Sequence, residues 1–233
     1  MSIENIIRET VYATRCFFNL KSYNKSYKES VRVQLPAYKR QLYSPENSEM
    51  RGRLLAKTRD RIKPMHSPYE RNTILHSIQS HDHVGNCGEH SCKALEYLVE
   101  KSKLIWAIYR RPFDIIMINL NSDISLFDHQ CVILSYNYPQ QPEYLPNLPD
   151  LFNQHQGAEI WVCDPWANIA CLSHNYPIEW KKKMHKWSNR GKLLCYGQED
   201  INPIDPRIYR FIEQSNASVM FREHVDFTPY HLQ

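Results

Sequence analysis

Short apolar segments separated by polar turns dominate the chain from residue 104 onward. They are LIWAIY (104–109), FDIIMINL (113–120), HQCVILSY (129–136), EIWVCD (159–164) and KLLCY (192–196). These segments are short, rich in β-branched and aromatic residues, and bounded by Pro, Asn and Asp, which is typical of strands. A four-proline stretch, YPQQPEYLPNLPD (138–150), is expected to form an irregular surface insertion between two of them.

The first third of the chain predicts helices instead. An amphipathic helix over 3–19 is expected to begin after Ser2, and a second helix over 45–62 after Ser44, with Pro45 at its first position and Gly52 inside it. A helical region followed by a run of strands predicts an α+β fold with an antiparallel sheet. We expect a basic, mainly helical N-terminal region over 1–71, within the same domain or as a small subdomain, and a core over 72–233.

Charge is distributed unevenly along the chain. Residues 1–75 hold 15 Lys and Arg against 7 Asp and Glu (+8), whereas residues 76–233 hold 14 against 18 (−4). The densest basic stretch, 51–63, comes without a zinc-finger spacing, an RNA-binding aromatic signature or a Gly-rich phosphate loop, so nucleic acid is not an expected partner. Two interpretations stay open for this stretch and for WKKKMHKW (180–187): a solvated face, or a surface for a polyanion or an acidic partner.

Composition places the chain among globular proteins without a membrane span or a conventional export signal. The mean hydropathy is −0.59, and no apolar run approaches the ~20 residues that cross a bilayer. Seven cysteines, an odd number without paired spacing, argue against a disulfide framework and favour a reducing compartment.

The segment HVGNCGEHSCKALEYL (83–98) places Cys87 at the start of an expected helix. Asn86 is a favoured N-cap and Glu89 follows three residues later, which approximates a capping box. The unpaired N–H groups and the dipole at a helix start favour a thiolate over a thiol. Glycines on both sides, Gly85 and Gly88, allow a sharp turn and close approach of a substrate to the backbone.

A thiolate nucleophile needs a base, and the base needs a group that orients it. Among eleven histidines, we expect His129 to serve as the base, because it lies at the start of an apolar strand that could hold the imidazole rigidly. The strand EIWVCD ends in Asp164 before Pro165, so this carboxylate is expected at the end of the sheet, where it could accept the far ring N–H of the histidine.

The three motifs GNCGEHSCKALEYL, DHQCVIL and WVCDPWAN together resemble the signature of papain-like and transglutaminase-like cysteine enzymes, especially Cys-His-Asp effector and toxin domains of pathogenic bacteria. The resemblance covers roughly residues 80–175. It implies that a helix bearing the cysteine packs on an antiparallel sheet that bears the other two residues on adjacent strands. It also implies that Cys87 is the nucleophile, His129 the base and Asp164 the orienting carboxylate.

In function, the resemblance implies attack by the thiolate on a carbonyl of a protein substrate to form a thioester, without a cofactor. Proteolysis, glutamine deamidation and transglutamination remain open, because all three share this first step. A host protein would be the substrate, after delivery into the host cell by a secretion system that does not require a signal peptide.

The sequence departs from the family pattern in two places. The interval from His129 to Asp164 is lengthened by the proline-rich insertion. The oxyanion donor is also unassigned: the papain pattern has a glutamine shortly before the cysteine, whereas Gln79 lies eight residues upstream, so Gln79 and Asn86 are only weak candidates and Gln130 is weaker still.

Two competing interpretations remain. The segment HDH (81–83), with Cys87, Cys92, Cys171 and His174, offers zinc-ligand types but no organising motif. Alternatively, the chain is a catalytically inactive scaffold that binds an acidic partner through its basic helical region.

Overall fold

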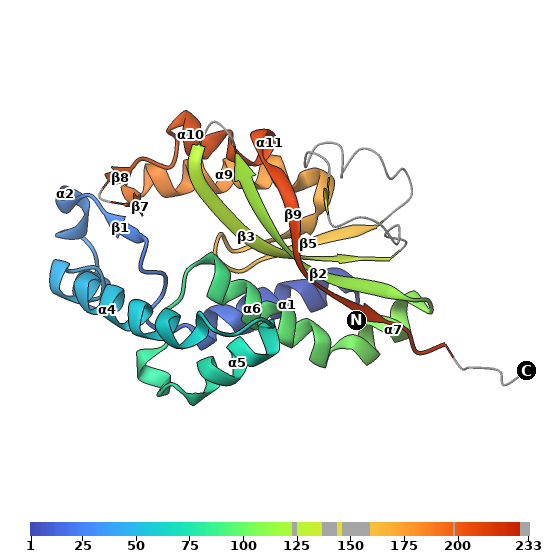
Figure 1. Ribbon diagram of the computed structural model, residues 1–233. Coiled ribbons are helices and arrows are strands. Elements are labelled where there is room, and N and C mark those ends of the chain that lie inside the picture. The colour runs from blue at the N-terminus through green and yellow to red at the C-terminus, as the bar shows by residue number, and fades with distance from the viewer. Residues whose placement is uncertain (123–124, 137–143, 146–158, 198, 229–233) are drawn as a thin grey trace, which may run out of the picture.

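The computed structural model describes residues 1–122, 125–136, 144–145, 159–197 and 199–228. These residues form an α+β structure with two antiparallel sheets, as the order of segments in the sequence predicts (Figure 1). The main sheet has six strands in the order β4 (Tyr144–Leu145), β9 (Asn216–Val225), β2 (Phe113–Ser122), β3 (Ser125–Ser135), β5 (Ile160–Asp164) and β6 (Ile169–Leu172). The smaller sheet has the order β1 (Lys25–Tyr27), β7 (Lys192–Tyr196) and β8 (Glu199–Ile201).

One face of the main sheet is covered by helices from the first half of the chain. They are α1 (Ile3–Phe17) and α6 (Cys87–Glu100), with α5 (Pro68–Ser77) and α7 (Ser102–Tyr109) beside them (Figure 1). Ile6 and Val11 of α1 and Leu95 of α6 are buried in one cluster with Ile115 and Val132 of the central strands. The first helix therefore contributes to the core of the sheet and is not a separate appendage.

The opposite face of the main sheet is covered by helices from the last quarter of the chain (Figure 1). They are α9 (Tyr176–Asn189), α10 (Pro206–Tyr209) and α11 (Phe211–Gln214). Trp180 and Phe211 are buried there with Ile116, Phe127 and Ile133 of the sheet. Because side chains alternate between the two faces of a strand, neighbouring residues of β3 enter different cores.

The predicted N-terminal helices form with the predicted caps. Ser2 accepts from Asn5 N–H ahead of α1, and Ser44 caps α4 (Pro45–Ile62) in the same way. A Cβ at Gly52 of α4 would lie 2.8 Å from the ring of Tyr23, so the glycine allows this ring to pack closely on the helix. Two short helices, α2 (Glu29–Arg32) and α3 (Ala37–Leu42), lie between β1 and α4.

The segment LIWAIY is helical in α7, so the prediction of a strand over 104–109 is wrong. Ile105 is fully buried, whereas Leu104 and Ile108 are exposed, which is the spacing of one helical face and not the alternation of a strand. A short apolar run fits either structure, and here α7 follows α6 almost directly before Arg110 ends it in a left-handed conformation.

Three further elements complete the described fold. Helix α5 starts at Pro68 after a capping box between Ser67 and Glu70, and the single-turn helix η1 (Ser80–Asp82) follows it. The segment KLLCY is a strand, but it lies in the small sheet. A second single-turn helix, η2 (Ser173–Asn175), precedes α9.

Most of the proline-rich insertion lies outside the described residues. Its two described residues form β4, which pairs with β9 at the edge of the main sheet. No helix in the described ranges is both long and apolar enough to cross a bilayer.

Candidate active site

Cys87 is the first residue of α6, as the sequence predicts. Asn86 precedes it in an extended conformation, and its N–H donates to Oε2 of Glu89 at 2.8 Å. The carboxylate of Glu89 also accepts two bonds from Arg59, at 2.8 and 3.2 Å, which holds the start of the helix against α4. The first N–H groups of a helix have no acceptor within the helix, and its dipole favours a negative charge there. The sulfur of Cys87 is therefore held at the start of a helix, next to its free N–H groups.

The sequence predicts His129 at the start of a strand. In the structure it lies within β3, four residues after the strand begins. β3 begins at Ser125, and its pairing with β5 covers only Val132–Ser135. The imidazole is fully buried on the sheet face that also carries Phe127, at a position where β5 has already ended. The side chain of His129 therefore lies beyond the part of β3 that pairs with β5.

Asp164 is the last residue of β5 and is also fully buried. Its Oδ2 accepts from Nε2–H of His129 at 2.9 Å and from the hydroxyl of Tyr176 at 3.0 Å. Its Oδ1 accepts from the N–H of Ala167 at 2.9 Å, which closes the turn after Pro165. The carboxylate therefore accepts three hydrogen bonds, and it fixes the imidazole with Nε2 as the protonated nitrogen.

The remaining nitrogen of His129, Nδ1, is the one that Asp164 does not bind. Nδ1 is buried and has no hydrogen-bond partner of good geometry among the described residues. The thiol of Cys87 lies close enough that a hydrogen bond and the charge of the sulfur both favour the imidazolium. The structure thus brings Cys87, His129 and Asp164 together in the order in which a thiol, a base and an orienting carboxylate would act.

Burial and charge act in opposite directions on this pair. Burial is the largest influence on His129 and lowers its pKa, but the carboxylate of Asp164 and the neighbouring Cys87 more than offset it and raise the pKa to about 9. Burial also raises the pKa of Asp164, yet His129, the N–H of Ala167 and the hydroxyl of Tyr176 together hold that pKa below its ordinary value. The geometry therefore favours an imidazolium next to an ionised carboxylate.

A cleft of about 430 Å³ opens beside Cys87. Asn86, Asp128 and Arg59 line it, together with Phe127 and Tyr196. Its volume is in the range of sites that hold a small ligand or a single side chain.

The two weak oxyanion candidates differ in position. Asn86 lines the cleft, but its side-chain oxygen accepts from the N–H of Asn24 at 3.4 Å. Gln79 is exposed at the start of η1 and is not among the residues that line the cleft. Gln130 lies closer, because a Cβ on Gly88 would be 3.0 Å from its side-chain oxygen.

Sequence reasoning missed most of the aromatic residues that enclose the imidazole. The rings of Trp166 and Trp180 lie 5.1 and 5.3 Å from that of His129, and Phe127 lies 6.4 Å away. The hydroxyl of Tyr176 was missed as well. Only Trp166 had a local signal, the Asp-Pro turn beside it. The others come from β3 and α9 and meet the site through the fold.

The zinc-ligand types noted in the sequence are otherwise engaged or apart. Both ring nitrogens of His83 lie 3.1 Å from backbone carbonyls, and His81 is exposed. Within the described ranges, no three or more His, Cys, Asp or Glu side chains are arranged to hold a metal ion. All seven cysteines are free.

Much of the basic stretch 51–63 is also engaged within the fold. Arg51 is fully buried and donates to the carbonyl of Ser22 at 3.0 Å. Arg53 pairs with Glu49, and Arg59 pairs with Glu89. These contacts give three of the basic residues of α4 a structural role.

Comparison of the chain with protein-family models, with curated proteins and with solved structures gives no match.

Proposed function

We propose that this chain is a cysteine-nucleophile enzyme of the papain-like or transglutaminase-like type, which acts on a protein substrate through a thioester. One observation carries the proposal: Asp164 binds Nε2 of His129, and the buried Nδ1 of the same ring is left to the thiol of Cys87. A thiol, an imidazole and a carboxylate in this order form the arrangement that activates a nucleophile in acyl transfer.

The first half of the reaction breaks an amide bond. Nδ1 of His129 accepts the thiol proton, and the sulfur of Cys87 attacks the carbonyl carbon of the substrate. The negative charge that develops on the substrate oxygen lies near the free N–H groups at the start of α6, which are suited to bind it. The imidazolium then donates its proton to the leaving nitrogen, the carbon–nitrogen bond breaks, and the acyl group stays on the sulfur as a thioester.

The second half of the reaction releases the acyl group. Water or a primary amine attacks the thioester carbon, Nδ1 accepts a proton from it, and the sulfur leaves and regains the proton from the imidazolium. Hydrolysis of a peptide thioester completes proteolysis, and hydrolysis of a glutamine thioester completes deamidation. Attack by an amine completes crosslinking. All three outcomes use the same three residues.

The surroundings of the imidazole support this cycle. Asp164 stays ionised through the reaction because its three donors are fixed by the turn at Ala167, by Tyr176 and by His129 itself. The rings of Trp166 and Trp180 exclude water from the ion pair. Exclusion of water strengthens the interaction of the imidazolium with Asp164 and with a thiolate.

The substrate class follows from the resemblance and from the position of the sulfur. We propose that the substrate is a host protein and that the chain is an effector of a pathogenic bacterium. A partly buried sulfur in a cleft beside a helix start fits a side chain or an extended peptide that enters from the surface.

Comparison of proteomes tests the proposal. Cells that express the wild type, Cys87→Ala or the control Cys16→Ala are compared by mass spectrometry; Cys16 is exposed on α1. The expected result is a cleaved peptide bond, a glutamine converted to glutamate or a new linked amine that depends on Cys87 and persists in the control. The same modifications in wild-type cells and in cells with folded Cys87→Ala would overturn the proposal.

A further inference from the structure

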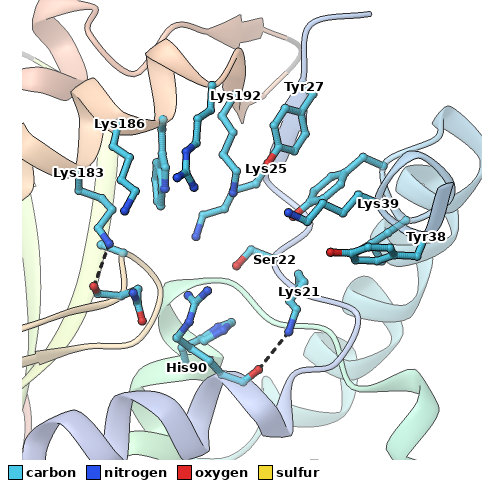
Figure 2. A pocket seen from close by; sticks show the side chains of 17 residues that line it. Lys21, Ser22, Lys25, Tyr27, Tyr38, Lys39, His90, Lys183, Lys186 and Lys192 are labelled. Atoms are coloured by element: carbon cyan, nitrogen blue, oxygen red, sulfur yellow. Dashed lines mark hydrogen bonds between the residues drawn. The ribbon is translucent and has the colours of Figure 1, made fainter. Parts of the chain in front are cut away.

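A second hollow, of about 310 Å³, lies between the segment before α4 and the segment that follows β6 (Figure 2). Four of the side chains that line it come from the first part of the chain: Arg15, Lys21, Lys25 and Lys39. Four more come from α9, the turn after it and the start of β7: Lys183, Lys186, Arg190 and Lys192. No Asp or Glu lines the hollow among the described residues.

These eight side chains have no ionic partner in the described part of the chain. The contrast is clear on α9, where Lys181 pairs with Glu213 and Lys182 pairs with Glu179, while Lys183 and Lys186 turn to the hollow. The nearest polar partner of Lys183 is a backbone carbonyl, that of Asn168, at 3.0 Å. One helix thus carries paired lysines outside the hollow and unpaired lysines along it.

Lys25 is the most buried of the eight. It is 5% exposed, it donates to the carbonyl of Trp166, and its Nζ lies 3.8 Å from the centre of that ring and 4.5 Å from that of Trp187. Burial lowers its pKa well below the ordinary value, and the neighbouring charge of Lys192 lowers it further. Burial followed by nearby cations also lowers the pKa of Lys183 and of Lys192 to about 8.

This arrangement is costly without a counter-ion. Buried ammonium groups lose hydration, and like charges that converge on one hollow repel one another. An anion that enters the hollow offsets both effects at once, because each phosphate oxygen can accept charge-assisted hydrogen bonds. Figure 2 shows amino groups from opposite walls, including those of Lys25, Lys186 and Lys39, directed toward the space between them.

We propose that this hollow binds a compact polyphosphate, a small molecule or headgroup that carries several phosphate groups. Eight basic side chains around about 310 Å³ suit several negative charges held close together. The volume is at the lower end of the range for small-molecule sites. An extended polyanion such as RNA is better matched by a strip of charge along an open surface than by cations that converge from several walls.

The polyphosphate site is joined to the candidate active site by short contacts. Arg15 donates to the carbonyl of Pro165 at 2.9 Å, directly after Asp164. Asn24, next to Lys25, accepts from the indole of Trp166 at 3.0 Å and donates to the side chain of Asn86 at 3.4 Å. Binding itself does not depend on the proposed catalysis, so it is measured on a Cys87→Ala chain.

Titration calorimetry with inorganic tripolyphosphate tests the proposal. In thermal denaturation, saturating tripolyphosphate is expected to raise the melting temperature of the chain by about 5 °C. Lys183→Ala with Lys186→Ala is expected to weaken binding roughly 100-fold, since each lost charge-assisted contact accounts for about tenfold. The matched control is Lys181→Ala with Lys182→Ala on the same helix. These two side chains form ion pairs with Glu213 and Glu179 outside the hollow, so their loss is expected to weaken binding less than about threefold.

Further arms separate the sources of the phosphate groups. Vesicles with and without phosphatidylinositol bisphosphate test whether the ligand is a lipid headgroup. If the chain binds the vesicles that contain this lipid and tripolyphosphate displaces it, the site is supported and its ligand is a headgroup. If the chain binds tripolyphosphate but not these vesicles, the ligand is a soluble polyphosphate. Three results would overturn the proposal. They are no binding of tripolyphosphate to the folded chain, equal losses in both double variants, or tight binding of a single-stranded RNA that tripolyphosphate does not displace.

Discussion

Asp164→Asn tests the role of the carboxylate with little change in volume. The carboxylate accepts three hydrogen bonds, from His129, from Tyr176 and from the N–H of Ala167. An asparagine side chain has a single acceptor oxygen, so at least one buried donor would face an amide NH₂. Such a mismatch costs about 1–3 kcal/mol, in addition to the lost charge.

The size of the effect on His129 follows from its environment. Burial lowers the pKa of the imidazole, and Asp164 is the largest influence that raises it, to about 9. Removal of an adjacent opposite charge shifts a pKa by about 1–3 units, and each unit corresponds to about 1.4 kcal/mol. We therefore expect the pKa of His129 in Asp164→Asn to fall to about 6–8, and the imidazolium to lose about 1–4 kcal/mol of stabilisation.

The pH dependence of stability has a definite sign. The folded-state pKa of His129 is raised, so its contribution to the free energy of unfolding is fully present below the ordinary histidine pKa of ~6.5 and is lost as pH rises through about 9. The difference in unfolding free energy between the wild type and Asp164→Asn is therefore expected to shrink over that interval. Chemical denaturation at several pH values measures it.

Nuclear magnetic resonance of ¹⁵N-labelled histidine measures the pKa of His129 directly. Asp128→Asn is the matched control, because Asp128 is the exposed neighbour of His129 in sequence and lines the cleft. We expect the control to leave the pKa of His129 within about half a unit of the wild type, as for a screened surface charge. A pKa in folded Asp164→Asn that equals or exceeds the wild-type value would refute this reasoning.

Three further substitutions test the surroundings of the site and the turns that flank β7 in the small sheet. Tyr176→Phe removes one hydrogen-bond donor from Asp164, so we expect a loss of about 1 kcal/mol in unfolding free energy and a small rise in the pKa of Asp164. Chemical denaturation measures the first and carboxyl ¹³C shifts measure the second. Unchanged values would contradict the hydrogen bond between Tyr176 and Asp164. Gly191→Ala forces a side chain onto a residue with φ +65° and brings Cβ to 2.5 Å from Val31, so a loss of about 2–4 kcal/mol is expected in denaturation. In Gly197→Ala, which has φ +59° and open space, the loss should be only about 1 kcal/mol, and equal losses would contradict the predicted clash.

Local signals in the sequence were sufficient for several elements. Ser2 and Ser44 mark the starts of α1 and α4 because a capped first turn depends only on neighbouring residues. The long runs of β2 and β3 needed no partner to be recognised, since their β-branched composition fits a buried strand. LIWAIY failed because six apolar residues satisfy a strand and a helix equally, and only packing beside α6 decides between them.

Elements with weak local signals were missed. The three-residue strand β1 forms because β7, more than 150 residues away, pairs with it. β6 continues the chain after the turn at Asp164. Helix α9 combines four lysines with four buried residues, Tyr176, Trp180, Met184 and Trp187, so charge masked its apolar stripe. None of these three elements has a clear signal within a short window of sequence.

The candidate site shows the same division. Asn86, Cys87 and Asp164 were placed by turn chemistry, which is local. Tyr176 and the ring of Trp180 reach the imidazole only because α9 covers the sheet face of His129. The polyphosphate site could not be predicted either, since its basic residues come from 15–39 and 183–192 and only the fold shows which lysines lack an acidic partner.

Alkylation of individual cysteines by iodoacetamide tests the central claim most directly. Cys16 is exposed, whereas Cys87 is only partly exposed, so accessibility alone predicts that Cys16 reacts first. If His129 activates the sulfur as proposed, Cys87 reacts fastest of the seven at slightly acidic pH, and His129→Ala slows it below Cys16 while the fold is retained. Faster reaction at Cys16 in the wild type, or an unchanged rate at Cys87 in folded His129→Ala, would contradict the account.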